Sequence, residues 1–486
     1  METTIYKAVI KAFSKALSKV PRGHQWHLSG YALTRQTSAA HVLGRVSLRL
    51  ILYYRNPACT GGSLGQIPWC SCFFFLTHPT QAQRFHSPND LLLPITKDVT
   101  TLQYVTKILH GTPLVPIKVV VDLGGPFLWT NCASRYASSS ILRVPNRSIQ
   151  CSRAKTNGLR SKTCLSSAQT CELLTENRVT RRATRGELVE DIVAVQLIDG
   201  SKNAGEITNV HHVLFSCAPT FLLNGLGSGA KGMLGLGRTR ISLPSQISTA
   251  LGTPQKFTIC LSSSEGILVS DQGPHDSVFG TEISKSLMYT PLVTNQGDNS
   301  LQEYFIGIKS IRIDDKRLSL NASLLSLDEE GIGGTKLSTI VPYTTMERTI
   351  YASFIEAYVK SATSMNMTRV ASVAPFGLCF SSESIDGTQL RPKVPVIDLV
   401  LQSEMVKWRI SGRNSMVRVS EEVMCLGFLD GGLNPRTSIV LGGYQLEETL
   451  LEFDVGASLL GFSQSLLMSR ISCSDFKSNS RLKEPL

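Results

Sequence analysis

A run of three β-branched residues that ends in an aspartate constrains this chain more than any other stretch. Residues 119–121 are all valine and lead directly into Asp122, which a Gly-Gly-Pro turn and a second apolar run follow. Apolar runs bounded by Gly and Pro are typical of a strand, a tight turn and a second strand. The sequence therefore predicts a hairpin over residues 115–129 that carries the Asp122 carboxylate on its turn.

The length and composition indicate a globular protein of two or three domains. The chain has 486 residues, of which 42% are apolar and 18% charged, and this is too long for one hydrophobic core. The formal net charge is +12 and the pI about 9.1. These values fit a basic soluble protein, or one that prefers acidic partners such as cell-wall polyanions or acidic enzymes. The basic residues are scattered without a recognition motif, so nucleic-acid binding is not predicted.

Twelve cysteines are many for a protein of a reducing compartment. Nine lie between Cys132 and Cys473 without a zinc-binding Cys-x-x-Cys pattern, which favours a secreted protein with disulfides. Because nine is odd, at least one thiol is unpaired or pairs with Cys59, Cys70 or Cys72. Three glycosylation sequons favour the same compartment, and their asparagines are Asn146, Asn321 and Asn366. No apolar run approaches the ~18–20 residues of a membrane span, and no metal site or cofactor is predicted.

The first 88 residues do not match the rest and are predicted to be an atypical, largely disordered extension. Residues 1–13 repeat residues 346–358 at seven of thirteen positions. One copied helix is not a repeat architecture, so we interpret residues 1–17 as the remnant of a tandem neighbouring gene or an error in the gene model. Residues 67–83 look like a signal-peptide remnant inside the chain, with a short buried strand as the alternative. The first residues of the chain do not read as a secretory signal.

Short strands at regular spacing predict a mostly β body from residue 91 onward. The clearest are at 91–95, 103–108, 186–195, 257–261, 304–308 and 459–463. Residues 133–180 are polar, contain three cysteines and are predicted to form a disulfide-tied loop region. Residues 232–237 are glycine-rich, but no Gly-Lys-Ser/Thr follows, so a phosphate-binding loop is not predicted.

The clearest helix is predicted to begin at Thr344. Thr344 and Glu347 have the spacing of a capping box, in which the hydroxyl and the carboxylate satisfy each other's free amides. Apolar residues follow at the spacing of one helical face. They are Ile350, Phe354, Ala357 and Tyr358.

From about residue 91 to its end, the chain resembles the plant pepsin-fold proteins that lack protease activity. These are the extracellular dermal glycoproteins, the basic seed globulins and the inhibitors of fungal xyloglucanases and xylanases. The matching stretches are 121–129, 215–221, 232–246, 304–311, 333–351, 373–380, 424–432 and 437–462. The resemblance implies a mostly β, bilobal pepsin-like aspartic protease fold, in which β-barrel-like lobes at 89–290 and 291–486 flank a cleft.

The resemblance also implies that the catalytic pair of this fold is incomplete. The pepsin pattern at the first site is Asp-Thr/Ser-Gly-Ser/Thr, whereas Leu-Gly-Gly follows Asp122 here. In active plant relatives an Asp-Ser/Thr-Gly stands in the second lobe, whereas here Ser338 replaces the second Asp and Ile340 the glycine. An aspartic protease needs two acids that share one proton, and a serine hydroxyl does not ionise near neutral pH.

The hairpin that covers the cleft in active enzymes also departs from their pattern. Active relatives carry a tyrosine there, and none occurs between Cys171 and Gly200. Arg181 stands where relatives have a small residue. We therefore expect Asp122 to be a structural remnant and proteolysis to be lost.

The cysteine pattern differs from that of the relatives as well. They usually carry six disulfides in the body, and three of those cysteines are absent here between residues 134 and 171. A less stable first lobe is expected, since a native disulfide typically contributes ~2–5 kcal/mol. Cys379 and Cys425 flank a hairpin in the second lobe, and we expect them to pair.

The resemblance implies an extracellular, monomeric cell-wall protein that inhibits microbial glycoside hydrolases, either a xyloglucan endoglucanase or a xylanase, in plant defence. Such enzymes hold paired carboxylates, which an Arg on an exposed loop could cap. Arg391 and Arg436 are the candidates. The alternatives are an aspartic endopeptidase, a storage or peptide-binding globulin, and a degenerate gene product without function.

Overall fold

The computed structural model describes most of the chain beyond residue 89. The described residues are 90–132, 138–155, 169–198, 204–270, 279–293, 302–388 and 391–476. The chain separates into two compact units, 1–85 and 86–486, and all described residues belong to the second. The predictions for the N-terminal extension, including the signal-peptide remnant, therefore lie outside the described residues.

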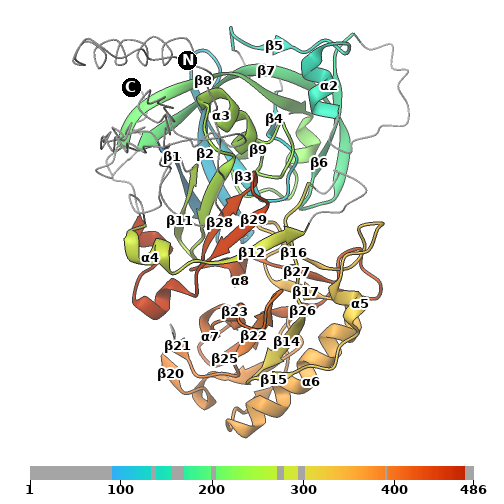
Figure 1. The fold of residues 1–486 in the computed structure, drawn as a ribbon, viewed down its shortest axis with the longest axis vertical. Coiled ribbons are helices and arrows are strands. Elements are labelled where there is room, and N and C mark those ends of the chain that lie inside the picture. Colours follow the sequence, from blue (N-terminus) through green and yellow to red (C-terminus); the bar gives the residue numbers. More distant parts are fainter. Residues whose placement is uncertain are drawn as a thin grey trace, which may run out of the picture. The chain divides into compact units, whose positions relative to one another are not determined.

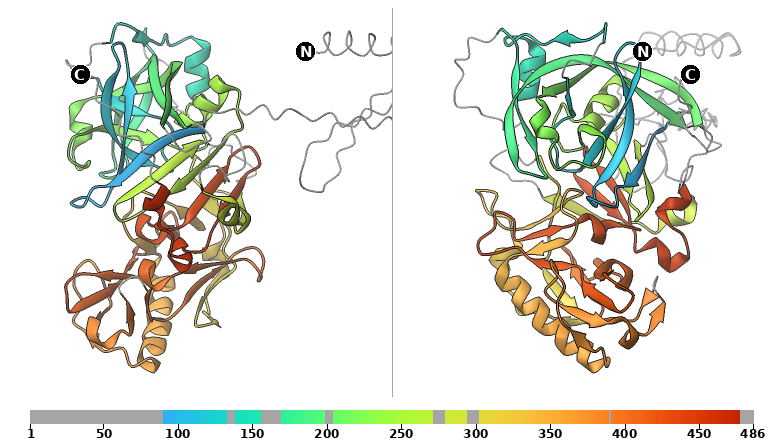
Figure 2. Two further views of the ribbon diagram at one scale, coloured as in Figure 1. Left: turned by 90° about the vertical axis from the view of Figure 1, so that its left-hand side faces the viewer. Right: turned by 180° about the vertical axis from the view of Figure 1, so that it is seen from behind.

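Short strands, most of them antiparallel, form two lobes (Figures 1 and 2). We call residues 90–270 the first lobe and residues 302–446 the second lobe. The strands of the first lobe are β1 (Asp90–Lys97), β2 (Tyr104–His110), β3 (Val115–Asp122), β4 (Trp129–Asn131), β5 (Leu142–Arg143), β6 (Glu172–Asn177), β7 (Arg182–Ile198), β8 (Ala204–Ala218), β9 (Ala230–Gly235), β10 (Lys256–Cys260) and β11 (Glu265–Ser270). Its helices are α2 (Ile149–Lys155), η1 (Thr220–Leu223) and α3 (Leu243–Leu251).

The second lobe repeats this β-rich construction and adds a long helix. Its strands are β13 (Phe305–Ile306), β14 (Ser310–Ile313), β15 (Lys316–Arg317), β16 (Thr335–Leu337), β17 (Thr344–Met346), β18 (Arg369–Val370), β19 (Cys379–Ser381), β20 (Gly387–Thr388), β21 (Arg391–Pro392), β22 (Ile397–Val400), β23 (Lys407–Ile410), β24 (Met416–Arg418), β25 (Val423–Leu426), β26 (Phe428–Asp430) and β27 (Ile439–Leu441). Its helices are α5 (Ala322–Leu325), α6 (Arg348–Ser364), η3 (Ser382–Ser384), α7 (Gly412–Ser415) and α8 (Gly443–Leu446).

Strand β9 lies between β3 and β4, so the hairpin predicted over 115–129 is wrong. β3 pairs with β9 in parallel, with Asp122 opposite Gly235, whereas β4 pairs with β9 antiparallel. Glycine permits this insertion, because a Cβ on Gly232 would lie 1.9 Å from the carbonyl oxygen of Trp129. The glycine-rich stretch that carries no phosphate-loop motif is therefore a central strand beside the aspartate.

The second lobe contains the same arrangement of three strands. β27 pairs with β16 in parallel and with β17 antiparallel. Ser338 follows β16 directly, as the end of β3 carries Asp122. The two lobes therefore present equivalent turns, one with an acid and one with a hydroxyl.

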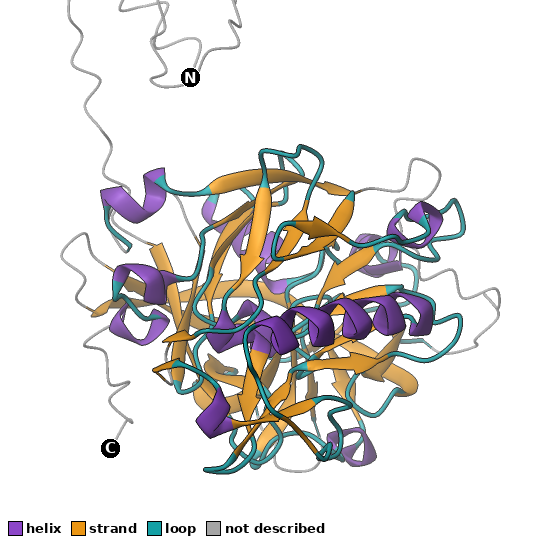
Figure 3. Cartoon of the chain, turned by 90° about the horizontal axis from the view of Figure 1, so that it is seen from below, coloured by secondary structure: helices purple, strands orange, loops and turns teal. Residues whose placement is uncertain are grey.

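The long helix α6, the longest purple helix in Figure 3, begins four residues later than predicted. Thr344 belongs to β17, and its hydroxyl donates to the side chain of Gln445 over 2.8 Å, so it caps no helix. The N-cap is Glu347, whose carboxylate accepts from the amide of Thr349 over 2.8 Å. Pairing with β26 and β27 holds the preceding residues in a strand. The buried face is formed by Ile350, Phe354, Tyr358 and Ala362.

Strand β6 lies in the region predicted as loops, residues 133–180, and forms a long antiparallel hairpin with β7, which contains the strand predicted at 186–195. The side chains of Leu173, Thr175 and Asn177 are buried, and the two between them are exposed. This alternation is that of a half-buried strand, even though the buried residues include two polar ones. The hairpin turn, residues 178–181, reaches the Asp122 turn.

The last strands of the chain pair with the first lobe. β28 (Leu450–Asp454) pairs with β10, β29 (Leu459–Phe462) pairs with β28, and β12 (Met288–Val293) pairs with β29. Together with β1 and β11 they form an antiparallel sheet in the order β1-β11-β10-β28-β29-β12, which we call the joining sheet. The rings of Phe257 and Phe453 stack across it with centroids 4.9 Å apart.

Four disulfides tie the described residues together. They are Cys132–Cys217, Cys151–Cys171, Cys260–Cys473 and Cys379–Cys425. The third links β10 to η5 (Cys473–Phe476) near the C-terminus, and the fourth links β19 to β25. The short helices α4 (Thr281–Lys285) and η4 (Leu466–Ser469) complete the described elements. No helix within the described ranges is long and apolar enough to cross a membrane.

Candidate functional site

The Asp122 carboxylate is buried at the end of a strand whose last valines are fully buried. The residue is 3% exposed, and its Oδ1 accepts a hydrogen bond from the amide of Gly124 over 3.1 Å. A Cβ on Gly125 would lie 2.8 Å from Oδ2 of the same carboxylate. The two glycines therefore let the turn fold back closely around the acid.

Ser338 occupies the equivalent turn of the second lobe and bonds within that turn. Its hydroxyl oxygen accepts from the amide of Ile340 over 3.2 Å and from the amide of Val341 over 3.3 Å. The serine thus reproduces the local backbone contacts of a turn carboxylate. It supplies no second acid to share a proton with Asp122.

Thr339 joins the two turns directly. Its buried hydroxyl donates to the carbonyl of Val121 over 2.7 Å and accepts from the amide of Leu123 over 3.0 Å. The residue that matches it in the first lobe is Leu123, which has no hydroxyl to return the contact. The hydroxyl of Thr339 therefore links the two turns, and the first-lobe turn has no equivalent hydroxyl at residue 123.

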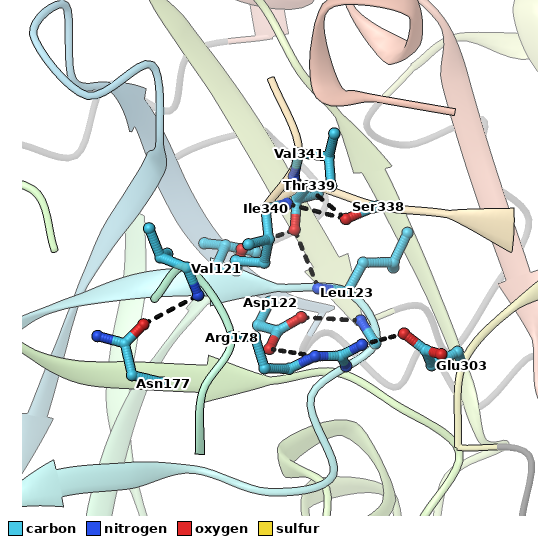
Figure 4. A network of polar contacts seen from close by, with 12 residues as sticks. Val121, Asp122, Leu123, Asn177, Arg178, Glu303, Ser338, Thr339, Ile340 and Val341 are labelled. Carbon is cyan, nitrogen blue, oxygen red and sulfur yellow. Dashed lines mark hydrogen bonds and ion pairs between the residues drawn. The ribbon is translucent and has the colours of Figure 1, made fainter. Parts of the chain in front are cut away.

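Arg178, at the turn between β6 and β7, lies against the Asp122 carboxylate (Figure 4). Its Nε is 3.7 Å from Oδ2 of Asp122, and its Nη2 is paired with Oε1 of Glu303. Lys336 on β16 approaches the same Glu303 carboxylate, with Nζ 3.0 Å from Oε1 and 3.1 Å from Oε2. We call Arg178, Glu303 and Lys336 together the Arg178 cap.

The cap packs tightly on the glycine turn. A Cβ on Gly124 would lie 2.8 Å from Nη1 of Arg178 and 3.1 Å from Cγ of Glu303. The side chain of Asn177 fixes the start of the hairpin turn, because it donates to the carbonyl oxygens of Leu222 and Asn224 over 2.7 and 2.9 Å. The backbone that carries Arg178 over Asp122 is therefore anchored by hydrogen bonds.

The charges of this cluster shift one another's proton affinity. Burial raises the pKa of Asp122 above its ordinary value, although Arg178 opposes the shift. Burial also raises the pKa of Glu303, but Arg178 and Lys336 together outweigh it and hold that pKa below its ordinary value. The pKa of Arg178 is raised, because its pairing with Asp122 and Glu303 outweighs its burial.

This arrangement suits ion pairing better than acid–base catalysis. Proteolysis needs one ionised and one protonated acid on either side of a water. Here Asp122 faces a guanidinium, and the second position carries a hydroxyl. No group of acids, histidines or cysteines within the described residues is arranged to hold a metal ion.

The two arginines proposed for an inhibitory loop differ in their surroundings. Arg391 is exposed, but its Nη2 donates to the carbonyls of Leu467 and Met468 over 2.7 and 3.2 Å. Arg436 is exposed on the loop between β26 and β27, and its carbonyl accepts from the amide of Gly333 over 2.8 Å. The structure thus fixes the backbone of Arg436 and engages the side chain of Arg391.

The three sequon asparagines are also in different settings. Asn321 and Asn366 are exposed, whereas Asn146 is half-buried and its Oδ1 accepts from Nζ of Lys155 over 3.0 Å. Asn321 caps α5, with its side chain accepting from the amide of Ser323. The surface settings of Asn321 and Asn366 suit a glycan better than that of Asn146.

Sequence reasoning did not find the Arg178 cap. It pointed to Arg181 in the same turn, which is exposed and has a left-handed backbone with φ 56°. A backbone of this kind favours glycine. Arg178, Glu303 and Lys336 meet because β13 pairs with β16 and the turn of the β6–β7 hairpin lies against them. The single available signal was a charged residue at a hairpin tip.

Two β-rich lobes, equivalent turns and a sheet that joins them define a pepsin-like bilobal protein, as the resemblance implied. Within this class, two family models cover most of the body. The model described as xylanase inhibitor N-terminal matches residues 104–269, and that described as xylanase inhibitor C-terminal matches residues 303–464. The chain therefore belongs to the xylanase-inhibitor family.

Individual relatives agree with this assignment. The chain is 48% identical over 425 residues to a Nicotiana benthamiana protein named probable aspartic proteinase GIP2, an alignment that covers 84% of this chain and 96% of the relative. It is 36% identical over 424 residues to basic 7S globulin 2 of Glycine max, covering 83% and 95%. The crystal structure of EDGP matches with a TM-score of 0.75 and 48% identity, covering 81% of this chain and 99% of that one.

Proposed function

We propose that this protein is a non-hydrolytic member of its family that binds and inhibits microbial glycoside hydrolases outside the cell. The family models named for xylanase inhibition support this proposal. The four disulfides support an oxidising compartment.

The observation that carries the proposal is the state of the candidate site. Asp122 is capped by Arg178 from within the chain, and Ser338 takes the second position. A cleft closed by its own ion pairs favours binding of a partner through the outer surface. The function then depends on exposed loops and not on the acid.

Arg436 is the better candidate for the residue that caps an enzyme's paired carboxylates. Its guanidinium is exposed on a loop with a fixed backbone, so little backbone entropy is lost when a partner binds. Arg391 would first have to leave the carbonyls of Leu467 and Met468. An arginine can pair with a carboxylate through two parallel hydrogen bonds.

The test is inhibition of a panel of fungal xyloglucan endoglucanases and xylanases by the oxidatively folded chain. We expect nanomolar to micromolar inhibition of at least one enzyme, and Arg436→Ala to weaken it about tenfold or more. Arg317→Ala, which removes an exposed arginine of β15, is the matched control and should change nothing. Lack of inhibition across the panel by a folded sample would refute the proposal and favour a storage globulin.

An aspartic endopeptidase is the second candidate, because Asp122 is present and a relative bears the name probable aspartic proteinase. A peptide-cleavage assay at acid pH, with and without pepstatin, separates the two. We expect wild type and Asp122→Asn to be equally inactive. Cleavage that disappears in Asp122→Asn would establish the endopeptidase instead.

A further inference from the structure

The Arg178 cap is open to solvent, whereas the acid beneath it is not. The side chain of Asp122 is 5% exposed, compared with 23% for Arg178, 24% for Glu303 and 19% for Lys336. The cap therefore forms the outer layer of the site and covers Asp122. A proton from solvent can reach Glu303 without any change in the fold.

The hairpin and the guanidinium are held by different contacts. The backbone of the turn is anchored by Asn177, and Val179 packs with the buried cluster that contains Phe127 and Trp129. The Arg178 guanidinium is held by Glu303 on one side and Asp122 on the other. Arg178 is hydrogen-bonded to Glu303, whereas its Nε is 3.7 Å from Oδ2 of Asp122, so loss of the Glu303 charge would weaken the closer contact of the guanidinium while the hairpin stays in place.

We propose that Glu303 is an acid-sensitive latch. Ionised Glu303 holds the Arg178 guanidinium over Asp122, and protonated Glu303 releases it, so that Asp122 becomes accessible from solvent. The latch closes the cleft at neutral pH and opens it in acid. This inference concerns the cleft and does not rest on inhibition of any enzyme.

The charges around the latch set the pH at which it opens. Arg178, Lys336 and Asp122 face Glu303, while Asp122, Glu303 and Glu176 act on Arg178. Because the two cations hold the pKa of Glu303 below its ordinary 4.5, the latch stays closed until the pH falls below that value. Asp122, with its raised pKa, takes up a proton before Glu303 does.

The test measures how fast Asp122 is modified by a water-soluble carbodiimide and an amine, with peptide mapping by mass spectrometry. Glu303→Gln removes the charge and keeps the shape. At pH 6 we expect Asp122 to be modified about tenfold faster in Glu303→Gln than in wild type, equivalent to about 1.4 kcal/mol. The ratio of the two rates should fall toward one as the pH is lowered below 4.5.

Glu447 is the internal reference, because it is an equally buried carboxylate with its side chain 4% exposed and paired with Lys97. Its modification should be unchanged in Glu303→Gln. A parallel rise at Asp122 and Glu447 would indicate general loosening and overturn the proposal, as would equal rates at Asp122 in the two proteins. Glu172→Gln, which removes a carboxylate of the same hairpin, is the control and should behave as wild type.

Arg178→Gln keeps the proposal testable if Glu303→Gln does not fold. This variant removes the guanidinium that covers the acid, so Asp122 should be modified rapidly at pH 6. Slow modification of Asp122 in Arg178→Gln would show that the cap does not control access.

Discussion

The hydroxyl of Thr339 satisfies two buried backbone groups of the opposite turn, and its removal should be costly. In Thr339→Val the amide of Leu123 and the carbonyl of Val121 lose their partner. Each unsatisfied buried group costs ~1–3 kcal/mol, so we expect a loss of about 3 kcal/mol in the free energy of unfolding. Urea unfolding followed by circular dichroism measures it.

The matched control for this substitution is Thr363→Val on α6. Its hydroxyl bonds the carbonyl of Val359 within an exposed helical turn, where water can replace it. The change in unfolding free energy should stay within about 0.5 kcal/mol. Equal effects of the two substitutions would show that the contact between the turns does not contribute more to the free energy of unfolding than an exposed hydrogen bond.

Glu303 should make the stability of the protein depend on pH in acid. A carboxyl whose pKa is lowered on folding stabilises the protein above its unfolded pKa, and this contribution is lost as the pH falls through the folded value. We expect Glu303→Gln to cost about 2 kcal/mol at pH 7 and less at pH 3. Urea midpoints at both pH values test this, and a cost that does not shrink in acid would contradict it.

At the scale of single residues, the site residues that belong to a sequence motif could be predicted. Those that meet only through strand pairing could not. Asp122 and Ser338 follow strands in recognisable patterns, so both could be placed on equivalent turns. Arg178, Glu303 and Lys336 belong to no motif. They meet because β13 pairs with β16 and the β6–β7 hairpin folds over them, and such pairings are not visible in a single sequence.

Among the elements, strand β9 depends most sharply on its glycines. In Gly232→Ala the added methyl would collide with the backbone of Trp129, which cannot move without breaking the β4–β9 pairing. We expect a loss of about 3 kcal/mol or more in unfolding free energy, or failure to fold. The secreted yield of soluble protein and its thermal melting temperature provide the measurement.

Gly456, in the turn between β28 and β29, provides the comparison. A Cβ there would meet only the carboxylate of Asp454 at 3.6 Å, and its backbone is outside the left-handed region. Gly456→Ala should therefore be neutral or slightly stabilising. A similar loss in both variants would mean that glycine is needed for general reasons and not for the insertion of β9.

Element types were more predictable than element ends and partners. The apolar spacing identified α6 correctly, but its start was placed at Thr344 because the capping pattern does not reveal that the neighbouring residues pair with β27. The two strands around Asp122 were also found. Their partner was not, because β9 comes from a distant part of the chain and lies between them.

For the whole molecule, the positive charge belongs largely to one end. Glu2 is the only acidic residue among the first 89, against ten lysines and arginines. The two-lobed body is therefore close to neutral. A preference for acidic partners, which the net charge suggested, would reside in the extension and not in the body.

The disulfide Cys260–Cys473, which closes a long loop, should stabilise the protein more than Cys151–Cys171, which closes a short one. Cys260–Cys473 closes a loop of 213 residues and Cys151–Cys171 one of 20. In the chain-entropy model this difference amounts to about 2 kcal/mol. We expect serine replacement of the first pair to lower the urea midpoint more than replacement of the second, and the reverse order would contradict the model.

The joining sheet has a consequence for how the protein is made. Strands β28 and β29, close to the C-terminus, pair with β10 and β12. While the ribosome is still translating the final segment, the N-terminal half exposes unpaired strand edges that invite aggregation. A premature stop codon late in the reading frame would remove these strands and thus prevent the first lobe from folding, although that lobe is encoded well before the stop.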